Sequence, residues 1–196
     1  MAESKRYNLS YRRQRDGKTN YKSRLNLLKS GIPRLIIRRT NKYFILQVAT
    51  YDQQGDMITI NAHSAELKDH GWMLRASSMP AAYLTGYLAG LRVKAADLPE
   101  VIADFGMQTV THKGTLFAIL KGVVDAGVNI PINKEFFPDE SRIKGEHIAT
   151  FASKTSGTQF AKTRKDAAEI TALFAKAKQS ITAQPQKKPA QKSQKK

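Results

Sequence analysis

Positive charge in this 196-residue chain is concentrated at its two ends. Residues 1–42 hold 13 Lys and Arg against two acids, a net charge of +11, and residues 176–196 hold seven Lys and no acid. The segment between them, residues 43–175, has 13 basic and 14 acidic residues and is close to neutral. Because like charges repel one another in a compact state, this division predicts a near-neutral folded body with a cationic segment at each end.

The cationic ends indicate a polyanionic partner. Solubility accounts for a net charge of +17 but does not require that the charge gather in two segments. The N-terminal segment is rich in Arg, which offers bidentate donors to phosphate and a planar group that stacks on bases. A cleaved mitochondrial presequence is also rich in Arg, but this segment continues directly into a patterned helix and strand. We therefore expect a nucleic acid as the partner, although a merely solvated cationic face is the simpler alternative.

The composition also excludes several classes of protein. The absence of Cys excludes disulfides, thiolate nucleophiles and zinc sites built on cysteine. No apolar run approaches the roughly 18 residues of a membrane span, and residues 1–11 lack the apolar stretch of a secretory signal. We expect a soluble intracellular protein.

The N-terminal third predicts an arm, a helix and a sheet. Residues 1–17 show no apolar period and are expected to form an extended arm. A helix capped at Thr19 or Asn20 follows and ends near Gly31, and its apolar positions predict one packed face. Strand patterns follow at 34–40, 43–51 and 57–61, with turn signals at 41–42 and 52–56. The sheet should therefore begin as an antiparallel meander.

The rest of the chain alternates between helix and strand patterns. Long helices are predicted at 78–96 and 114–126, a buried strand at 100–105, a loop at 130–145 and an amphipathic helix at 166–181. Ala82, Gly86 and Gly90 form a stripe of small residues in the first long helix, which we expect to lie against the sheet. The pattern predicts an α/β (α+β) fold, a mixed sheet with helices packed on one side. The Lys-rich end should form a flexible tail.

No combination of residues indicates catalysis. The four histidines, His63, His70, His112 and His147, are scattered and have no second ligand at metal-binding spacing. Residues 111–115 admit two interpretations, a phosphate-binding helix start or an ordinary polar loop. No nucleophile is paired with a base, so we expect neither an enzyme nor a metal or cofactor site.

Several separated motifs occur in the order found in one ribosomal protein family. They are RRQRDGKTNYKSRLNLLKSGIPRLIIRRTNKYFILQV (12–48), NAHSAEL (61–67), GW (71–72), MPAAYLTGYLAGLR (79–92), KGVVDAGVNIP (121–131) and RIKGEHIA (142–149). With these motifs the chain resembles, over about residues 6–152, the 5S rRNA-binding protein of the large ribosomal subunit in its archaeal and eukaryotic form. The lack of a much longer C-terminal extension favours an archaeal member.

The resemblance implies a structural protein of the cytoplasmic ribosome that anchors 5S rRNA to the large rRNA in the central protuberance. Other ribosomal proteins would be its neighbours, among them the other 5S-binding protein, and neither DNA nor a membrane is implied. The chain then divides into an RNA-binding arm (1–17), a globular 5S-binding domain (18–152), an extension with an amphipathic helix (153–182) and a disordered tail (183–196). The alternatives are an RNA-modifying or RNA-processing enzyme with a basic arm, and a free RNA chaperone.

The resemblance also assigns the rRNA contacts. They carry over to thirteen positions: Arg12, Arg13, Arg15, Thr19, Tyr21, Arg24, Ser30, Gly31, Pro33, Arg34, Arg38, Asn41 and Lys42.

Overall fold

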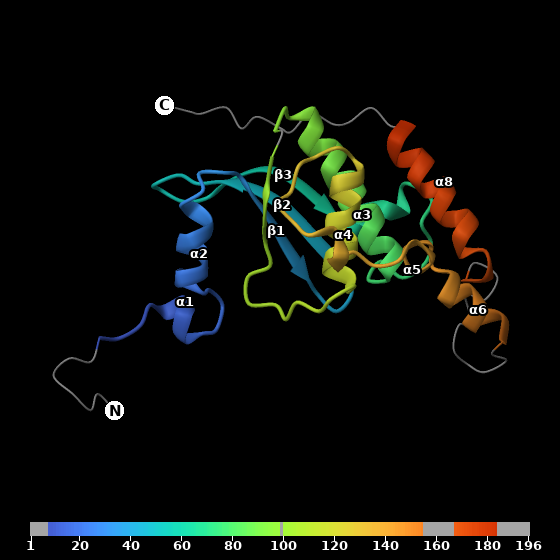
Figure 1. The fold of residues 1–196 in the computed structure, drawn as a ribbon, viewed down its shortest axis with the longest axis horizontal. Helices are drawn as coiled ribbons and strands as arrows, with labels where there is room; N and C mark the ends of the chain where they lie inside the picture. The colour runs from blue at the N-terminus through green and yellow to red at the C-terminus, as the bar shows by residue number, and fades with distance from the viewer. Residues whose placement is uncertain (1–7, 99, 155–166, 184–196) are drawn as a thin grey trace.

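A four-stranded mixed sheet organises the molecule (Figure 1), which a computed structural model describes over residues 8–98, 100–154 and 167–183. The sheet has the strand order β3-β2-β1-β4. Its strands are β1 (Arg34–Arg39), β2 (Phe44–Thr50), β3 (Met57–His63) and β4 (Ile102–Asp104).

The sheet begins as the predicted antiparallel meander. Leu35 of β1 lies opposite Val48 of β2, and Val48 lies opposite Ile60 of β3. Thr40 donates its backbone N–H to the Tyr43 carbonyl at 2.9 Å, which closes the β1–β2 turn. The crossover through the long helix then brings β4 beside β1 in parallel, and this confirms the mixed sheet.

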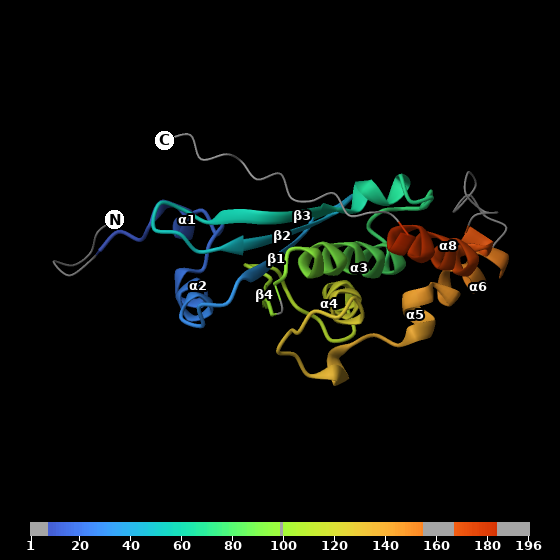
Figure 2. The ribbon, with the colours of Figure 1, turned by 90° about the horizontal axis from the view of Figure 1, so that it is seen from above.

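Nine helical segments accompany the sheet in the described part of the chain. They are α1 (Arg12–Arg15), α2 (Tyr21–Leu28), η1 (Ser64–Lys68), α3 (Met79–Ala95), α4 (Thr115–Asp125), η2 (Lys134–Phe136), α5 (Glu140–Lys144), α6 (Glu146–Lys154) and α8 (Ile170–Ala183). Figure 2 shows α3 and α4 on the same side of the sheet, as predicted, while α1 and α2 stand beside its end.

The core lies between one face of the sheet and α3. The alternating residues of β1 and β2 that face it are buried, as the period of two requires; they are Leu35, Ile37, Phe44, Leu46 and Val48. Helix α3 begins where Ser78 Oγ accepts the Ala81 N–H and Pro80 occupies the first turn. It is buried on most of its circumference because the sheet, α4 and α8 all pack against it.

The stripe of small residues in α3 faces α4, and the expectation that it faces the sheet is wrong. A Cβ on Gly86 would collide with the carbonyl group of Ile119 in α4, and one on Gly90 would lie 2.6 Å from the Cβ of Ala126. Gly122 of α4 fits in the same way against the Tyr83 carbonyl. Paired glycines on both helices let the two backbones approach closely.

Other local predictions also need correction. Residues 12–15 of the expected extended arm form one helical turn, and the expected loop 130–145 contains η2 and α5. Strand β4 covers only three of the residues predicted at 100–105. Residues 1–7 of the expected arm and 184–196 of the expected tail lie outside the described residues, while Ala183, expected in the tail, is the last residue of α8.

The predicted C-terminal amphipathic helix is present as α8 and packs on α3. Ile170, Phe174 and Ala177 of its apolar face are buried. Lys178 Nζ donates to the Tyr83 hydroxyl at 2.9 Å, and that hydroxyl donates to Asp125 Oδ2 of α4 at 2.8 Å. Burial, together with the hydrogen bond to Asp125, raises the pKa of Tyr83. These two hydrogen bonds therefore link helices α8, α3 and α4.

Candidate nucleic-acid interface

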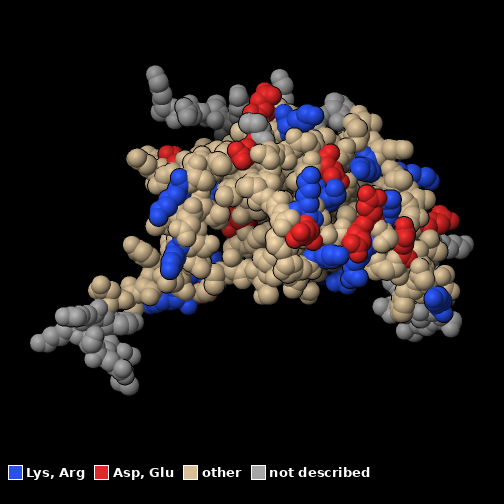
Figure 3. Space-filling model, viewed as in Figure 1, with Lys and Arg blue, Asp and Glu red and all other residues tan. Residues whose placement is uncertain are grey.

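The first cationic element is the single turn α1. Its arginines Arg12, Arg13 and Arg15 are all exposed, and the turn has no buried residue. Arg13 Nε donates to Thr19 Oγ1 at 3.0 Å, whereas Arg12 and Arg15 form no side-chain bond with any described residue. On the face shown in Figure 3, Lys and Arg gather over α1 and α2, while positive and negative side chains mix over the other helices. The free guanidinium groups are therefore available to an external anion.

Helix α2 is only partly covered by the rest of the protein, with Tyr21, Arg24, Leu27 and Leu28 partly buried. Asn20 Oδ1 caps it by accepting the Ser23 N–H at 3.1 Å, but none of its residues is buried and Leu25 is 56% exposed. The sequence predicted one packed face for this helix. Tyr21 and Leu28 of that face are partly buried, whereas Leu25 is exposed. Tyr21 lies against Tyr11, with ring centroids 5.0 Å apart. Exposed aromatic rings beside unpaired cations are the groups on which single-stranded bases stack.

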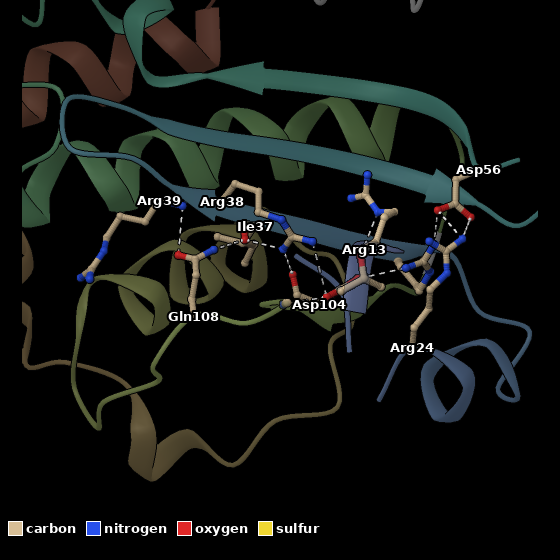
Figure 4. A network of polar contacts seen from close by, with 11 residues as sticks. Arg13, Arg24, Ile37, Arg38, Arg39, Asp56, Asp104 and Gln108 are labelled. Carbon is tan, nitrogen blue, oxygen red and sulfur yellow. Dashed lines mark hydrogen bonds and ion pairs between the residues drawn. The ribbon is translucent and has the colours of Figure 1, made fainter. Parts of the chain in front are cut away.

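A chain of ion pairs connects α2 to the sheet (Figure 4). Arg24 Nη2 lies 2.9 Å from Asp56 Oδ2, which belongs to the turn between β2 and β3. Arg34 Nη2 lies 2.8 Å from the same Asp56 oxygen, and Arg34 Nη1 lies 2.9 Å from Asp104 Oδ2 of β4. These alternating Arg and Asp side chains connect α2, the tip of the β2–β3 hairpin and strand β4.

Arg34 is part of the protein interior. The residue is only 2% exposed, and its guanidinium is occupied by two carboxylates. The Asp56 contact is an ion pair without hydrogen-bond alignment, and Arg34 Nε has no hydrogen-bond partner among the described residues. Arg34 thus presents no surface to RNA in this conformation, and Arg24 is engaged by Asp56 as well.

A second cationic group lies at the far end of β1. Lys42 and Asn41 are exposed in the β1–β2 turn, and Arg75 Nη2 donates to the Asn41 carbonyl at 3.4 Å. Arg38 Nη1 bonds to the carbonyls of Ile37 and Asp104 at 3.0 and 3.1 Å, whereas the Arg39 guanidinium has no partner among the described residues. The thirteen positions assigned by the resemblance include neither Arg39 nor Arg75. Arg75 stands apart from the basic cluster, so the sequence carried no signal for it.

The thirteen assigned positions therefore divide between two places. Positions 12–34 lie at the α2 end of β1, where Ser30 Oγ donates to the Leu27 carbonyl at 2.7 Å and Gly31 adopts a φ of +69° before Pro33. Arg38, Asn41 and Lys42 lie toward the other end. A six-residue strand spans roughly 20 Å, which separates the two groups.

Other kinds of site find no support in the described residues. They contain no cluster of three metal-ligating side chains and no helix long and apolar enough to cross a membrane. At residues 111–115, the N–H groups of Lys113 and Gly114 bond to the carbonyls of Phe136 and Thr111. These two amides are already satisfied within the chain, which favours the polar-loop interpretation over a phosphate site.

Unpaired cations beside exposed aromatic rings, on a body with no catalytic constellation in its described part, are typical of nucleic-acid-binding proteins. The sequence profile of the family described as ribosomal large subunit proteins 60S L5 and 50S L18 matches residues 5–98. The large ribosomal subunit protein uL18 of Korarchaeum cryptofilum is 50% identical over 154 residues, 79% of each chain. That of Methanothermobacter thermautotrophicus is 42% identical over 152 residues, 78% of this chain and 79% of its own.

The chain belongs to the uL18 family of large ribosomal subunit proteins. This confirms the resemblance drawn from the sequence motifs and the prediction of a structural ribosomal protein that is not an enzyme. No comparison favours the alternative of an RNA-modifying or RNA-processing enzyme.

Proposed function

We propose that this protein binds 5S rRNA and anchors it to the large rRNA in the central protuberance of the cytoplasmic large subunit. Other ribosomal proteins, including the second 5S-binding protein, would be its neighbours there. The observation that carries the proposal is the α1–α2 surface: Arg12 and Arg15 have no side-chain partner among the described residues, Tyr11 is 72% exposed, and neither helix has a fully buried residue.

Folding without RNA gives α1 and α2 little stability. A four-residue helix and an eight-residue helix without a fully buried residue are marginal by themselves, because helices this short rely on packing for their stability. Phosphate contacts from Arg12 and Arg15, and stacking on Tyr11 or Tyr21, supply the missing interactions when RNA is bound. The α1–α2 surface is thus better suited to an RNA complex than to an isolated body.

We propose distinct roles for the assigned residues. Arg12, Arg13, Arg15, Thr19 and Tyr21 contact RNA from the α1–α2 surface, and Asn41 and Lys42 contact it from the β1–β2 turn. Ser30, Gly31 and Pro33 shape the link that sets α2 against the sheet, while Arg24, Arg34 and Arg38 hold the scaffold through Asp56 and Asp104.

A salt titration tests the proposal. The affinities of the full chain for 5S rRNA and for an unrelated folded RNA of equal length are measured across ionic strength. Each neutralised phosphate contributes about −0.7 to −0.9 to the slope of log affinity against log salt, so we expect a slope of several units. We also expect a preference for 5S rRNA that persists at high salt. Equal affinity for both RNAs at every salt concentration would reject 5S recognition.

A pair of charge-matched variants locates the surface. Replacing Arg12, Arg13 and Arg15 together by Ala should reduce the steepness of the salt slope by about two to three units, because three phosphate contacts are lost. The control replaces Lys134, Lys154 and Lys176, which are exposed outside the α1–α2 surface, and removes the same charge. Equal losses in both triple variants would mean that only net charge matters.

A further inference from the structure

The side chain of Gln108 continues the β1 edge where β4 ends. The parallel pairing of β1 with β4 stops at Ile36 and Asp104. Beyond it, Gln108 Oε1 accepts the Arg39 backbone N–H at 3.0 Å, and Gln108 Nε2 donates to the Ile37 carbonyl at 2.7 Å (Figure 4). A primary amide offers the same donor and acceptor as a peptide group, so this side chain substitutes for the missing strand residues.

A tight turn returns Gln108 to the strand. Gly106 adopts a φ of +64°, its N–H donates to Asp104 Oδ1 at 2.8 Å, and the Gln108 N–H donates to the Phe105 carbonyl at 3.4 Å. A Cβ at position 106 would lie 2.9 Å from Arg38 Nη1. Glycine suits this position because it tolerates the positive φ, and because a Cβ there would crowd the Arg38 side chain.

The neighbouring residues Arg38 and Arg39 differ in their surroundings. Arg38 is held by the Ile37 and Asp104 carbonyls, whereas the Arg39 guanidinium is exposed and Figure 4 shows it directed away from the network. The Arg39 backbone lies opposite Phe44 of β2 and donates its N–H to Gln108 on its other side. A cation on a fixed backbone loses less conformational entropy when it binds an anion than one on a mobile loop.

We propose that Arg39 contacts an rRNA phosphate and that Gln108 is the positioning residue that holds it in place. This inference rests on the proposed rRNA-binding function and adds two residues to it. Gln108 acts through the Arg39 backbone and needs no RNA contact of its own. Arg38, its neighbour in sequence, serves the scaffold.

A double-mutant cycle tests the coupling between the two residues. Gln108→Met keeps the approximate shape of the side chain and removes both hydrogen bonds, and Arg39→Ala removes the proposed phosphate contact. We expect Arg39→Ala to weaken 5S rRNA binding about fivefold at physiological salt and to make the salt slope about 0.7 to 0.9 shallower. Gln108→Met should weaken binding by a smaller factor, and the double variant should match Arg39→Ala within about twofold.

Amide hydrogen exchange on the free protein provides a readout that does not depend on RNA. The Arg39 N–H should exchange slowly in the native chain and faster in Gln108→Met, while the core of β2 stays protected. Gln179→Met, an exposed substitution on α8, is the matched control and should change neither exchange at Arg39 nor RNA affinity.

The possible outcomes are distinguishable. If the native chain binds 5S rRNA selectively and Arg39→Ala binds equally well, the inference is overturned and the proposed function stands. If the losses of Gln108→Met and Arg39→Ala simply add, Gln108 does not act through Arg39 and its assignment as positioning residue is overturned. If the native chain shows no preference for 5S rRNA, the proposed function is lost and this inference with it.

Discussion

Arg34 and Asp104 form a buried ion pair across the parallel edge of the sheet, with Arg34 Nη1 2.9 Å from Asp104 Oδ2. The two residues are 70 positions apart in the chain and only 2% and 8% exposed. Their pairing holds β4 against the start of β1, next to the segment that leads from α2 into the sheet. A buried pair of this kind is costly to break because the remaining charge has no solvent to stabilise it.

Removing the Asp104 carboxylate should therefore destabilise the fold strongly. We expect Asp104→Ala to lower the free energy of unfolding by about 3–5 kcal/mol, since Arg34 is left buried with only Asp56. Urea denaturation followed by circular dichroism measures this loss. The control Glu140→Ala breaks the exposed pair with Lys144 and should change stability by less than about 0.5 kcal/mol. Similar losses in both variants would mean that the Arg34 pair is not buried in solution.

The α3–α4 contact predicts that a helix-favouring substitution is harmful. Gly→Ala in a helix interior ordinarily stabilises by about 1 kcal/mol. At Gly86 the new methyl group would meet the Ile119 carbonyl, so we expect Gly86→Ala to destabilise by at least about 2 kcal/mol. Thermal and urea unfolding measure the change, and Ala172→Gly on the exposed face of α8 calibrates the ordinary propensity effect. A stabilised Gly86→Ala variant would contradict the close approach of the two helices.

Stability should fall as the solution is acidified through the range of histidine titration. Burial lowers the pKa of His70 below its usual value of 6.5, and its Nδ1 lies 3.4 Å from Ser180 Oγ of α8. Burial and nearby Arg142 also lower the pKa of His147. Because the unfolded chain then binds more protons than the folded chain, the free energy of unfolding decreases as pH drops below about 6.5.

Urea denaturation between pH 7.5 and pH 5 checks this dependence. We expect His70→Gln to lower the stability at pH 7.5 and to reduce the slope of stability against pH, since one of the two shifted histidines is removed. An unchanged slope in His70→Gln would show that His70 does not contribute to the acid sensitivity.

The arm should gain protection from exchange only on RNA. Residues 8–17 contain one helical turn that buries nothing, while fixing each backbone residue costs about 1–2 kcal/mol. We expect peptides covering residues 8–17 to exchange freely in the free protein and slowly in the 5S rRNA complex, while β1, β2 and α3 are protected in both. Protection of the arm in the free protein would mean that it is part of the folded body.

The sequence predicted the meander and the long helices correctly because their signals are local. Period-two alternation in β1 and β2, and Ser78 with Pro80 at the start of α3, act within a few residues. It was less accurate for α2, where Tyr21 and Leu28 of the predicted face are partly buried but Leu25 is exposed. Amphipathic spacing shows that a helix has an apolar side but does not show what lies against that side.

The distribution of charge, the positions of the strands and long helices, and the family of the chain all follow from the amino-acid sequence. Which arginines are free depends on how the chain folds. Residue type does not distinguish Arg34, Arg38 and Arg39, but Asp104 pairs closely with the first, contacts the second through its carbonyl and a longer 3.9 Å ion pair, and leaves the third exposed. Burial and ion pairing depend on partners some 70 residues away in the chain, and residue type and local spacing do not specify those partners.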